Sequence, residues 1–150
     1  MSRRNGRILA VQALYSYDLG KIPLEELLEF EWTNDNPVEE TELSVETTEN
    51  ASGAQSEARD YARIVISGTV EHLAEIDAQI KSHLTGKWDF DRVNKVTIAI
   101  LRMSVYSLMF QKDVSPSIVI DEAVSISKDF GTDDSYKFIN AILDNIRKGL

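Results

Sequence analysis

The sequence contains no cysteine among its 150 residues. This absence excludes disulfides and every enzyme with a cysteine nucleophile, and it removes the thiolate ligands from which structural zinc sites are usually built. No apolar run approaches the ~20 residues that a membrane span requires, and the start Met1-Ser2-Arg3-Arg4 lacks the apolar core of a signal peptide. We therefore expect a cytoplasmic protein with no membrane partner.

The sequence also lacks the motifs of the common enzyme classes. It has no glycine-rich phosphate loop, no His-Glu-x-x-His zinc motif and no Gly-x-Ser-x-Gly nucleophile elbow. The only histidines, His72 and His83, stand three helical turns apart and cannot share a metal, so we interpret them as helix-surface residues. The acids Asp121 and Glu122 cannot flank one bond, because adjacent helix positions diverge by about 100°. We predict a protein that is not an enzyme and has no cofactor or metal.

The charge of the chain is strongly uneven. The net charge is −9, yet residues 1–17 carry Arg3, Arg4 and Arg7 with no acid. Residues 18–60 carry thirteen acids against two bases. Because the Debye length is roughly 8 Å at physiological salt, the basic N-terminus can act almost independently of acids placed far away.

Helical periodicity runs through most of the chain, and no segment alternates as a strand would. Helices are predicted over 3–19, 24–32 and 57–84, from a cap at Asp91 to Phe110, over 115–130, and from a cap at Asp133 or Asp134 onward. Gly20, Gly86 and Gly131 are the predicted helix ends, and Gly68 is a predicted bend. The stretch 98–110 is apolar on nearly all sides, which is typical of a bundle's central helix. The 43% hydrophobic fraction suffices for one domain. We predict an all-α bundle of about six to seven helices in two small subdomains.

Two helices have sharp apolar stripes, and one segment has none. The stripes that we expect to be buried are Val119, Ala123, Ile126 and Phe130 in one helix, and Phe138, Ile139, Ile142, Leu143 and Ile146 in the last. Residues 33–56 contain scattered aliphatics and many acids, too little apolar surface to offset the entropy of ordering the chain. We predict a mobile acidic loop there, either a solvated spacer or an extension that binds a basic partner.

Arg102 interrupts the apolar central helix, where an unpaired charge would cost several kcal/mol. We expect a structural ion pair with a neighbouring helix, for which Glu122 is the suggested carboxylate. A contact of Arg102 with RNA is the alternative.

The N-terminal arginines are the first candidate site. Arg3 and Arg7 stand one turn apart with Arg4 nearby, so their guanidinium groups could converge on one phosphate track or base edge. Three solubilising arginines are the alternative. A weaker signal is Ser135-Tyr136-Lys137-Phe138, because a lysine beside an aromatic ring suits a single strand, although core packing explains Phe138 equally well.

Short blocks of characteristic residues occur in order along the chain. They are Arg3-Arg4-x-x-Arg7, Ala10-Val11-Gln12-Ala13-Leu14-Tyr15, Trp88, Arg92, Ile100-Leu101-Arg102, Tyr106, Val119-Ile120-Asp121-Glu122-Ala123, Lys128-x-Phe130-Gly131, Ser135-x-Lys137-Phe138-Ile139-Asn140 and Leu143-Asp144. Taken together, these blocks resemble the NusB family of bacterial transcription antitermination factors. They cover most of the chain outside residues 33–56. Each block alone is weak evidence for this family, but the blocks are jointly specific for it.

The resemblance implies an all-α fold of two helical subdomains and a factor that binds the boxA element of ribosomal RNA leaders together with NusE. It further implies assembly with the transcription elongation complex and other Nus factors, as a monomer or a homodimer. The implied RNA-binding residues are Arg3, Arg4, Arg7, Gln12, Asp134, Lys137 and Phe138, and the implied NusE-binding residues are Tyr15 and Leu19. A helical adaptor that binds proteins without direct RNA contact is the alternative.

A NusB-like domain also precedes the catalytic part of some ribosomal RNA methyltransferases, but this sequence stops at Leu150 without a methyl-donor-binding domain, so we do not expect an enzyme. The chain departs from the family pattern at four places. Asn5 and Gly6 thin an arginine cluster that is often denser, Thr97 stands where the family commonly has an acid, and Ala141 replaces a usual glycine. The missing acid at Thr97 bears on the NusE contact. The acidic insert is longer than the family leads us to expect.

Overall fold

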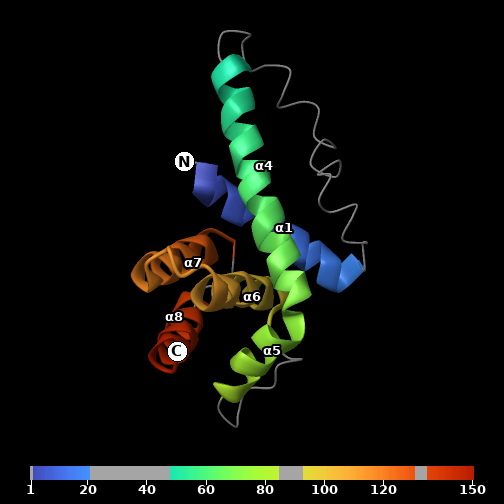
Figure 1. Cartoon of the computed structure of the whole chain (residues 1–150). Helices are drawn as coiled ribbons and strands as arrows, with labels where there is room; N and C mark the ends of the chain where they lie inside the picture. The colour runs from blue at the N-terminus through green and yellow to red at the C-terminus, as the bar shows by residue number, and fades with distance from the viewer. Residues whose placement is uncertain (1, 21–47, 85–92, 131–134) are drawn as a thin grey trace. The chain divides into compact units, whose positions relative to one another are not determined.

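The computed structural model describes residues 2–20, 48–84, 93–130 and 135–150, which form six helices and no strand. In chain order the helices are α1 (Ser2–Gly20), α4 (Thr48–Glu71), α5 (Leu73–Ser82), α6 (Lys95–Phe110), α7 (Pro116–Phe130) and α8 (Ser135–Lys148) (Figure 1). The chain divides into two compact units, residues 1–66 and 67–150, and the boundary falls inside α4. The prediction of an all-α fold is confirmed. The predicted helix over 24–32 lies outside the described residues.

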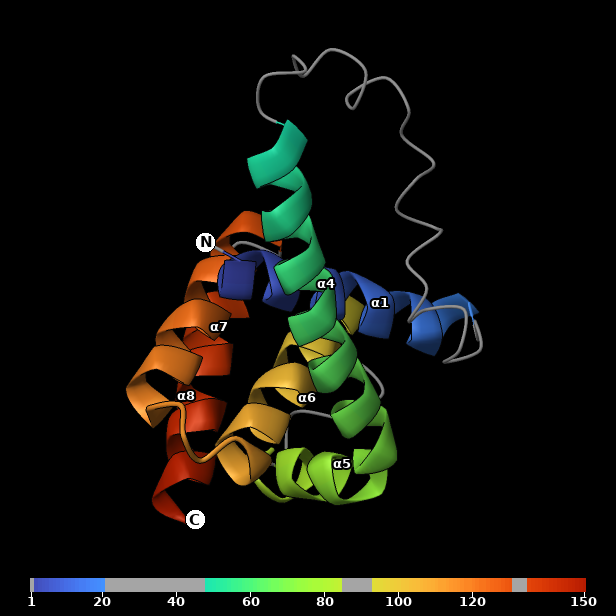
Figure 2. The same ribbon diagram turned by 45° about the horizontal axis from the view of Figure 1, so that its top comes forward.

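Unit 1 is built where α1 crosses the first part of α4 (Figure 2). Its buried apolar side chains are Ala10, Val11, Ala13, Leu14, Ala58, Ala62, Val65 and Ile66. Small residues let the two helices approach closely: a Cβ added at Gly6 would lie 2.8 Å from the backbone oxygen of Ala58 and 2.9 Å from Cδ2 of Tyr61. The glycine is therefore required by the packing, which explains why no arginine stands at this position.

The start of α4 lies inside the segment that was predicted to be a mobile loop, so that prediction is wrong for residues 48–56. Residues 48–56 are helical, whereas the sequence analysis assigned all of 33–56 to a mobile segment. Ala51, Ala54 and Gln55 are good helix formers, but Asn50 and Gly53 are not, so helix propensity alone does not account for this part of α4. Hydrophobic periodicity does not detect such a helix. Residues 33–47 lie outside the described part of the chain.

The predicted helix over 57–84 is divided into two. α4 continues through Gly68 and ends at Glu71, and His72, with φ −105° and ψ 23°, separates it from α5. The glycine serves a close contact, because a Cβ at Gly68 would overlap the ring of Tyr106 on α6. The predicted bend therefore lies four residues further on, and the predicted terminator Gly86 lies outside the described residues.

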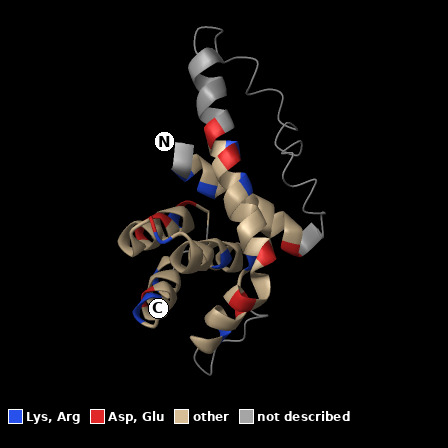
Figure 3. Ribbon diagram, viewed as in Figure 1, with Lys and Arg blue, Asp and Glu red and all other residues tan. Residues whose placement is uncertain are grey.

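Unit 2 is organised around α6, of which eleven residues are buried, from Thr97 to Leu108. Apart from Lys95 at its start, Arg102 is the only charged residue of this helix (Figure 3). The helix is capped by Asn94, whose side-chain oxygen accepts from Val96 N at 2.9 Å and from Thr97 N at 3.4 Å. The predicted cap, Asp91, lies outside the described residues, and the cap that starts α6 stands three positions later.

Arg102 has the structural ion pair that its burial requires. Its Nε and Nη2 donate to Oδ1 and Oδ2 of Asp77 at 2.9 Å and 3.0 Å, a bidentate pair between α6 and α5. The Arg102 side chain is 9% exposed and that of Asp77 is 18% exposed. The predicted pairing with a neighbouring helix is confirmed, with a carboxylate that sequence reasoning did not single out.

The last two helices pack side by side and bury most of the expected stripes (Figures 1 and 2). In α7 the buried residues include Val119, Ala123 and Ile126, but Phe130, which was expected among them, is 48% exposed at the end of the helix. In α8 the buried apolar residues are Ile139, Ile142, Leu143 and Ile146, and Phe138 is half-buried. Within the described residues, no helix combines the length and apolarity needed to cross a membrane.

Candidate nucleic-acid interface

Four of the accessible residues of α1 form one stripe along the helix. Arg4 and Ile8 are half-buried, and Gln12 and Tyr15 are exposed. Their spacings of four, four and three residues place them on one helix face. This stripe, which we call the α1 stripe, joins a guanidinium, an amide and an aromatic ring. It brings together the predicted RNA-binding residues Arg4 and Gln12 and the predicted partner residue Tyr15.

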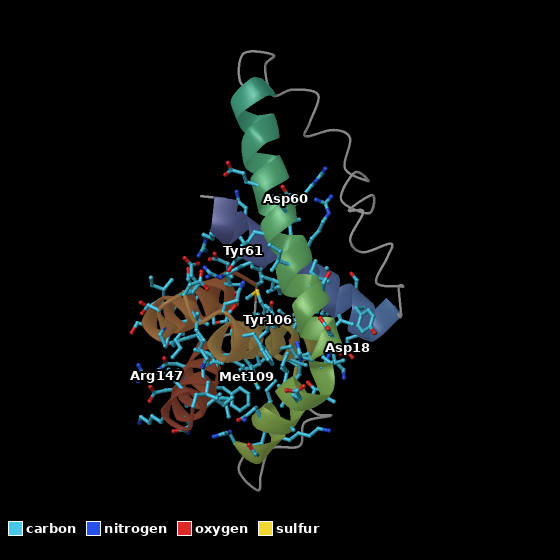
Figure 4. The ribbon with its side chains drawn as sticks, viewed as in Figure 1. Asp18, Asp60, Tyr61, Tyr106, Met109 and Arg147 are labelled. Carbon is cyan, nitrogen blue, oxygen red and sulfur yellow. The ribbon has the colours of Figure 1, made fainter. Side chains whose placement is uncertain are left out.

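Arg7 lies on another side of α1 and is only 4% exposed. Its guanidinium carbon lies 5.6 Å from the centroid of the Tyr61 ring, a cation–π contact with α4 inside unit 1. Figure 4 labels Tyr61 on α4. The sequence predicted that Arg3 and Arg7 would converge on one ligand, but the face of Arg7 is the packed face. Of the side chains of Arg3 and Leu19, which the resemblance also implicates, the structure describes nothing.

A second cationic group lies at the start of α8 in unit 2. Lys137 is exposed, as its predicted contact with RNA requires, and its Nζ lies 5.9 Å from the centroid of the Tyr136 ring. The Nζ of Lys128, from the last turn of α7, lies over the same ring at 4.9 Å. Phe138 is half-buried, and the third predicted contact, Asp134, lies outside the described residues. Sequence reasoning did not identify Lys128 as a site residue, because only the packing of α7 on α8 brings it to the ring.

Two departures from the family pattern have clear surroundings. Thr97 is 2% exposed, and its backbone N–H is bound by the Asn94 side chain at the start of α6. The threonine side chain therefore presents no group to a partner. Ala141 is exposed on α8.

Neither histidine belongs to a cluster of metal ligands among the described residues. The ring of His72 stacks on that of Phe110 with centroids 4.1 Å apart, and its Nδ1 lies 3.3 Å from Oε1 of Glu75. The Nδ1 of His83 lies 2.9 Å from the backbone oxygen of Gln79. His72 therefore takes part in packing beyond the surface role expected from the sequence.

The carboxylate of Asp144 has a clearly lowered pKa, and it lies near the C-terminal end of α8, whereas Lys137 lies at the start of this helix. The hydrogen bond from Lys148 lowers the pKa of Asp144, and the charges of Lys148 and Arg147 lower it further, against a desolvation effect that raises it. Both cations lie in the last turn of α8, where positive charge also complements the helix dipole. The C-terminal end of α8 is thus an internally paired surface.

Comparison with known proteins gives one family. The sequence model of the NusB family matches residues 4–148. Transcription antitermination protein NusB of Treponema denticola is 45% identical over 147 residues, which are 98% of this chain and 96% of that relative. The solved structure of T. maritima NusB is 35% identical, with a TM-score of 0.76 and coverage of 97% of this chain and 90% of that chain.

A further solved structure, of the antitermination factors NusB and NusE in complex with dsRNA, contains a chain that is 28% identical, with a TM-score of 0.75 and coverage of 99% of this chain and 98% of that chain. Sequence and fold agree over nearly the whole length of the relatives. The chain therefore belongs to the NusB family.

Proposed function

We propose that this chain is an RNA-binding transcription antitermination factor that binds the boxA element of ribosomal RNA leaders together with NusE. Family membership over residues 4–148 supports the proposal, as does the similar chain that was solved with NusE and dsRNA. The factor acts in the cytoplasm, within the transcription elongation complex and with other Nus factors. It recognises RNA and catalyses no reaction.

The observation that carries the proposal is the α1 stripe. Arg4 and Gln12 can bind a phosphate and a base edge, and Tyr15 offers a ring 36% exposed to a protein partner. At 1.5 Å per residue, the backbone distance from Arg4 to Tyr15 is about 16 Å along the helix. RNA and NusE would then contact neighbouring parts of one helix face, which explains why the two ligands bind together.

The three N-terminal arginines have different roles in this proposal. We assign the phosphate contacts of α1 to Arg3 and Arg4. Arg7, buried over Tyr61, holds α1 on α4 and thereby orients the α1 stripe. On α8, Lys137 supplies a further phosphate contact, and Phe138 and Asp134 meet unstacked bases.

A fluorescence-anisotropy titration of boxA RNA, with and without NusE, tests the proposal. Three to four neutralised phosphates predict that log K falls with log salt at a slope of roughly −2 to −3, using about −0.7 per contact for single strands. Arg4→Gln should flatten the slope by about 0.7. Lys112→Gln removes the same charge from an exposed position in the turn after α6 and should leave the slope unchanged.

Failure of the proposal has a distinct form. If the wild-type chain binds NusE but has no affinity for boxA RNA at any salt concentration, with or without NusE, it is a protein-only adaptor. If Arg4→Gln and Lys112→Gln give the same slope, Arg4 is not a phosphate contact.

A further inference from the structure

Two lysines from different helices share one aromatic ring on unit 2. Lys128 ends α7, and Tyr136 and Lys137 begin α8. The two ammonium nitrogens lie 4.9 Å and 5.9 Å from the centroid of the Tyr136 ring. Both lysines are exposed and the ring is half-buried, so all three groups reach solvent. We call this group the lysine–tyrosine cluster.

The chemistry of the cluster suits a single nucleic-acid strand. Lysine ammonium groups act as flexible point charges toward phosphates. An aromatic ring provides a platform on which an unpaired base stacks, whereas bases inside a duplex are already stacked on each other. The distances to the common centroid limit the separation of the two nitrogens to about 11 Å, so both lysines can engage the phosphates that flank one or two nucleotides of a single strand.

The lysines also explain how the ring becomes available. In the free protein the positive charges rest against the negative face of the ring. A phosphate is a stronger partner for an ammonium group than a ring face is, because both partners are ionised. When RNA arrives, Lys128 and Lys137 can turn to the phosphates and release the ring for a base.

We propose that Lys128 and Tyr136, together with Lys137, form a one- to two-nucleotide contact for single-stranded RNA, with a base on the Tyr136 ring and phosphates on the two lysines. The inference rests on the proposed function and extends it, because the predicted contacts on unit 2 were Lys137, Phe138 and Asp134. It places RNA contact on α7 as well as on the start of α8.

Pairs of variants distinguish the contribution of the lysine charge to RNA binding from that of the tyrosine ring. Lys128→Gln should flatten the salt slope for single-stranded boxA RNA by about 0.7, and Lys128→Arg should restore it. Tyr136→Leu should weaken binding by about 5- to 150-fold, the range that loss of one stacked base gives, and Tyr136→Phe should bind nearly as the wild type does. Lys112→Gln is the charge-matched control. Thermal unfolding by circular dichroism shows whether each variant is folded at the binding temperature.

A direct contact can be located without any substitution. BoxA RNA carrying 5-iodouridine at one position at a time, irradiated in the complex with the full chain, should crosslink to Tyr136 from one or two adjacent positions. Peptide mass spectrometry identifies the crosslinked residue. This measurement decides the question if Tyr136→Leu proves to be unfolded.

The outcomes separate this inference from the proposed function. If Arg4→Gln flattens the slope while Lys128→Gln and Tyr136→Leu bind as the wild type does, the inference is wrong and the proposed function stands. If the wild type binds no boxA RNA, both are wrong. If Lys128→Gln weakens binding of NusE and leaves RNA binding unchanged, the cluster is a protein interface, and the inference is again wrong.

Discussion

Removal of the Asp77 carboxylate should deprive the buried guanidinium of Arg102 of its bidentate partner. The two hydrogen bonds of 2.9 Å and 3.0 Å join side chains that are only 9% and 18% exposed. Loss of one member of a buried ion pair costs roughly 3–5 kcal/mol, because the other charge stays desolvated. Since Asp77 keeps some access to water, we expect Asp77→Ala to lower the free energy of unfolding by about 3 kcal/mol. For a chain of this size that is a fall in Tm of about 6–12 °C.

A double-mutant cycle isolates the pair from other effects of the substitutions. Arg102→Met and Asp77→Ala should each destabilise the protein, whereas the double variant should lose less than their sum, because no buried charge is left without its partner. Urea unfolding followed by far-ultraviolet circular dichroism measures all four proteins. Asp121→Ala, at an exposed position of α7, should change stability by no more than about 0.5 kcal/mol. Additivity of the two single effects within about 0.5 kcal/mol would refute the reasoning.

Three further predictions concern helix packing, capping and pH. Gly6→Ala gains about 1 kcal/mol of helix propensity, but it forces a Cβ to 2.8 Å from the Ala58 backbone oxygen, at a cost of roughly 1–3 kcal/mol. The Tm of this variant should therefore fall, and a rise in Tm would contradict the close packing of α1 on α4. Asn94→Ala should lower the free energy of unfolding by about 1 kcal/mol, and Asn94→Asp should lower it much less, because an aspartate can still cap α6. Urea unfolding measures both values, and equal losses of stability would show that the side-chain cap contributes nothing. The lowered pKa of Asp144 means that its ionised form stabilises the fold fully above its unfolded-state pKa of ~3.9, and that this contribution is lost as the pH falls through the lower folded-state value. Asp144→Asn should therefore show a shallower acid loss of Tm, and an unchanged acid profile would argue against the pair with Lys148.

Sequence periodicity predicts those helices whose faces differ sharply in polarity. The prediction over 3–19 agrees with α1, and the four buried aliphatics of α8 are those expected. Hydrophobic periodicity gives a wrong prediction where a helix forms without burying an apolar face, or where an apolar residue lies beyond the end of the core. Residues 48–56 are helical without an apolar face, and Phe130 belongs to the apolar stripe by spacing but stands at the last residue of α7, where the core has ended.

The candidate site depends on contacts that the sequence does not display. Helical spacing predicted that Arg3, Arg4 and Arg7 could reach one ligand, but it does not say which face packs, and the close approach of α4 at Gly6 buries Arg7. Lys128 and Tyr136 stand eight positions apart and meet only because α8 folds back along α7. Arg102 could be expected to have a carboxylate partner, while the identity of Asp77 required the arrangement of α5 on α6.

The ring of Tyr106 occupies the space in which a side chain at position 68 would stand, so these two positions share a single volume. A side chain added at position 68 must displace the ring of Tyr106, whereas a smaller residue at 106 leaves room for one. We therefore expect the two positions to covary across relatives, with aromatic residues at 106 accompanied by glycine at 68. Directed-evolution libraries that randomise position 68 alone should mostly return glycine, while libraries that randomise both positions should recover larger residues at 68 together with smaller ones at 106.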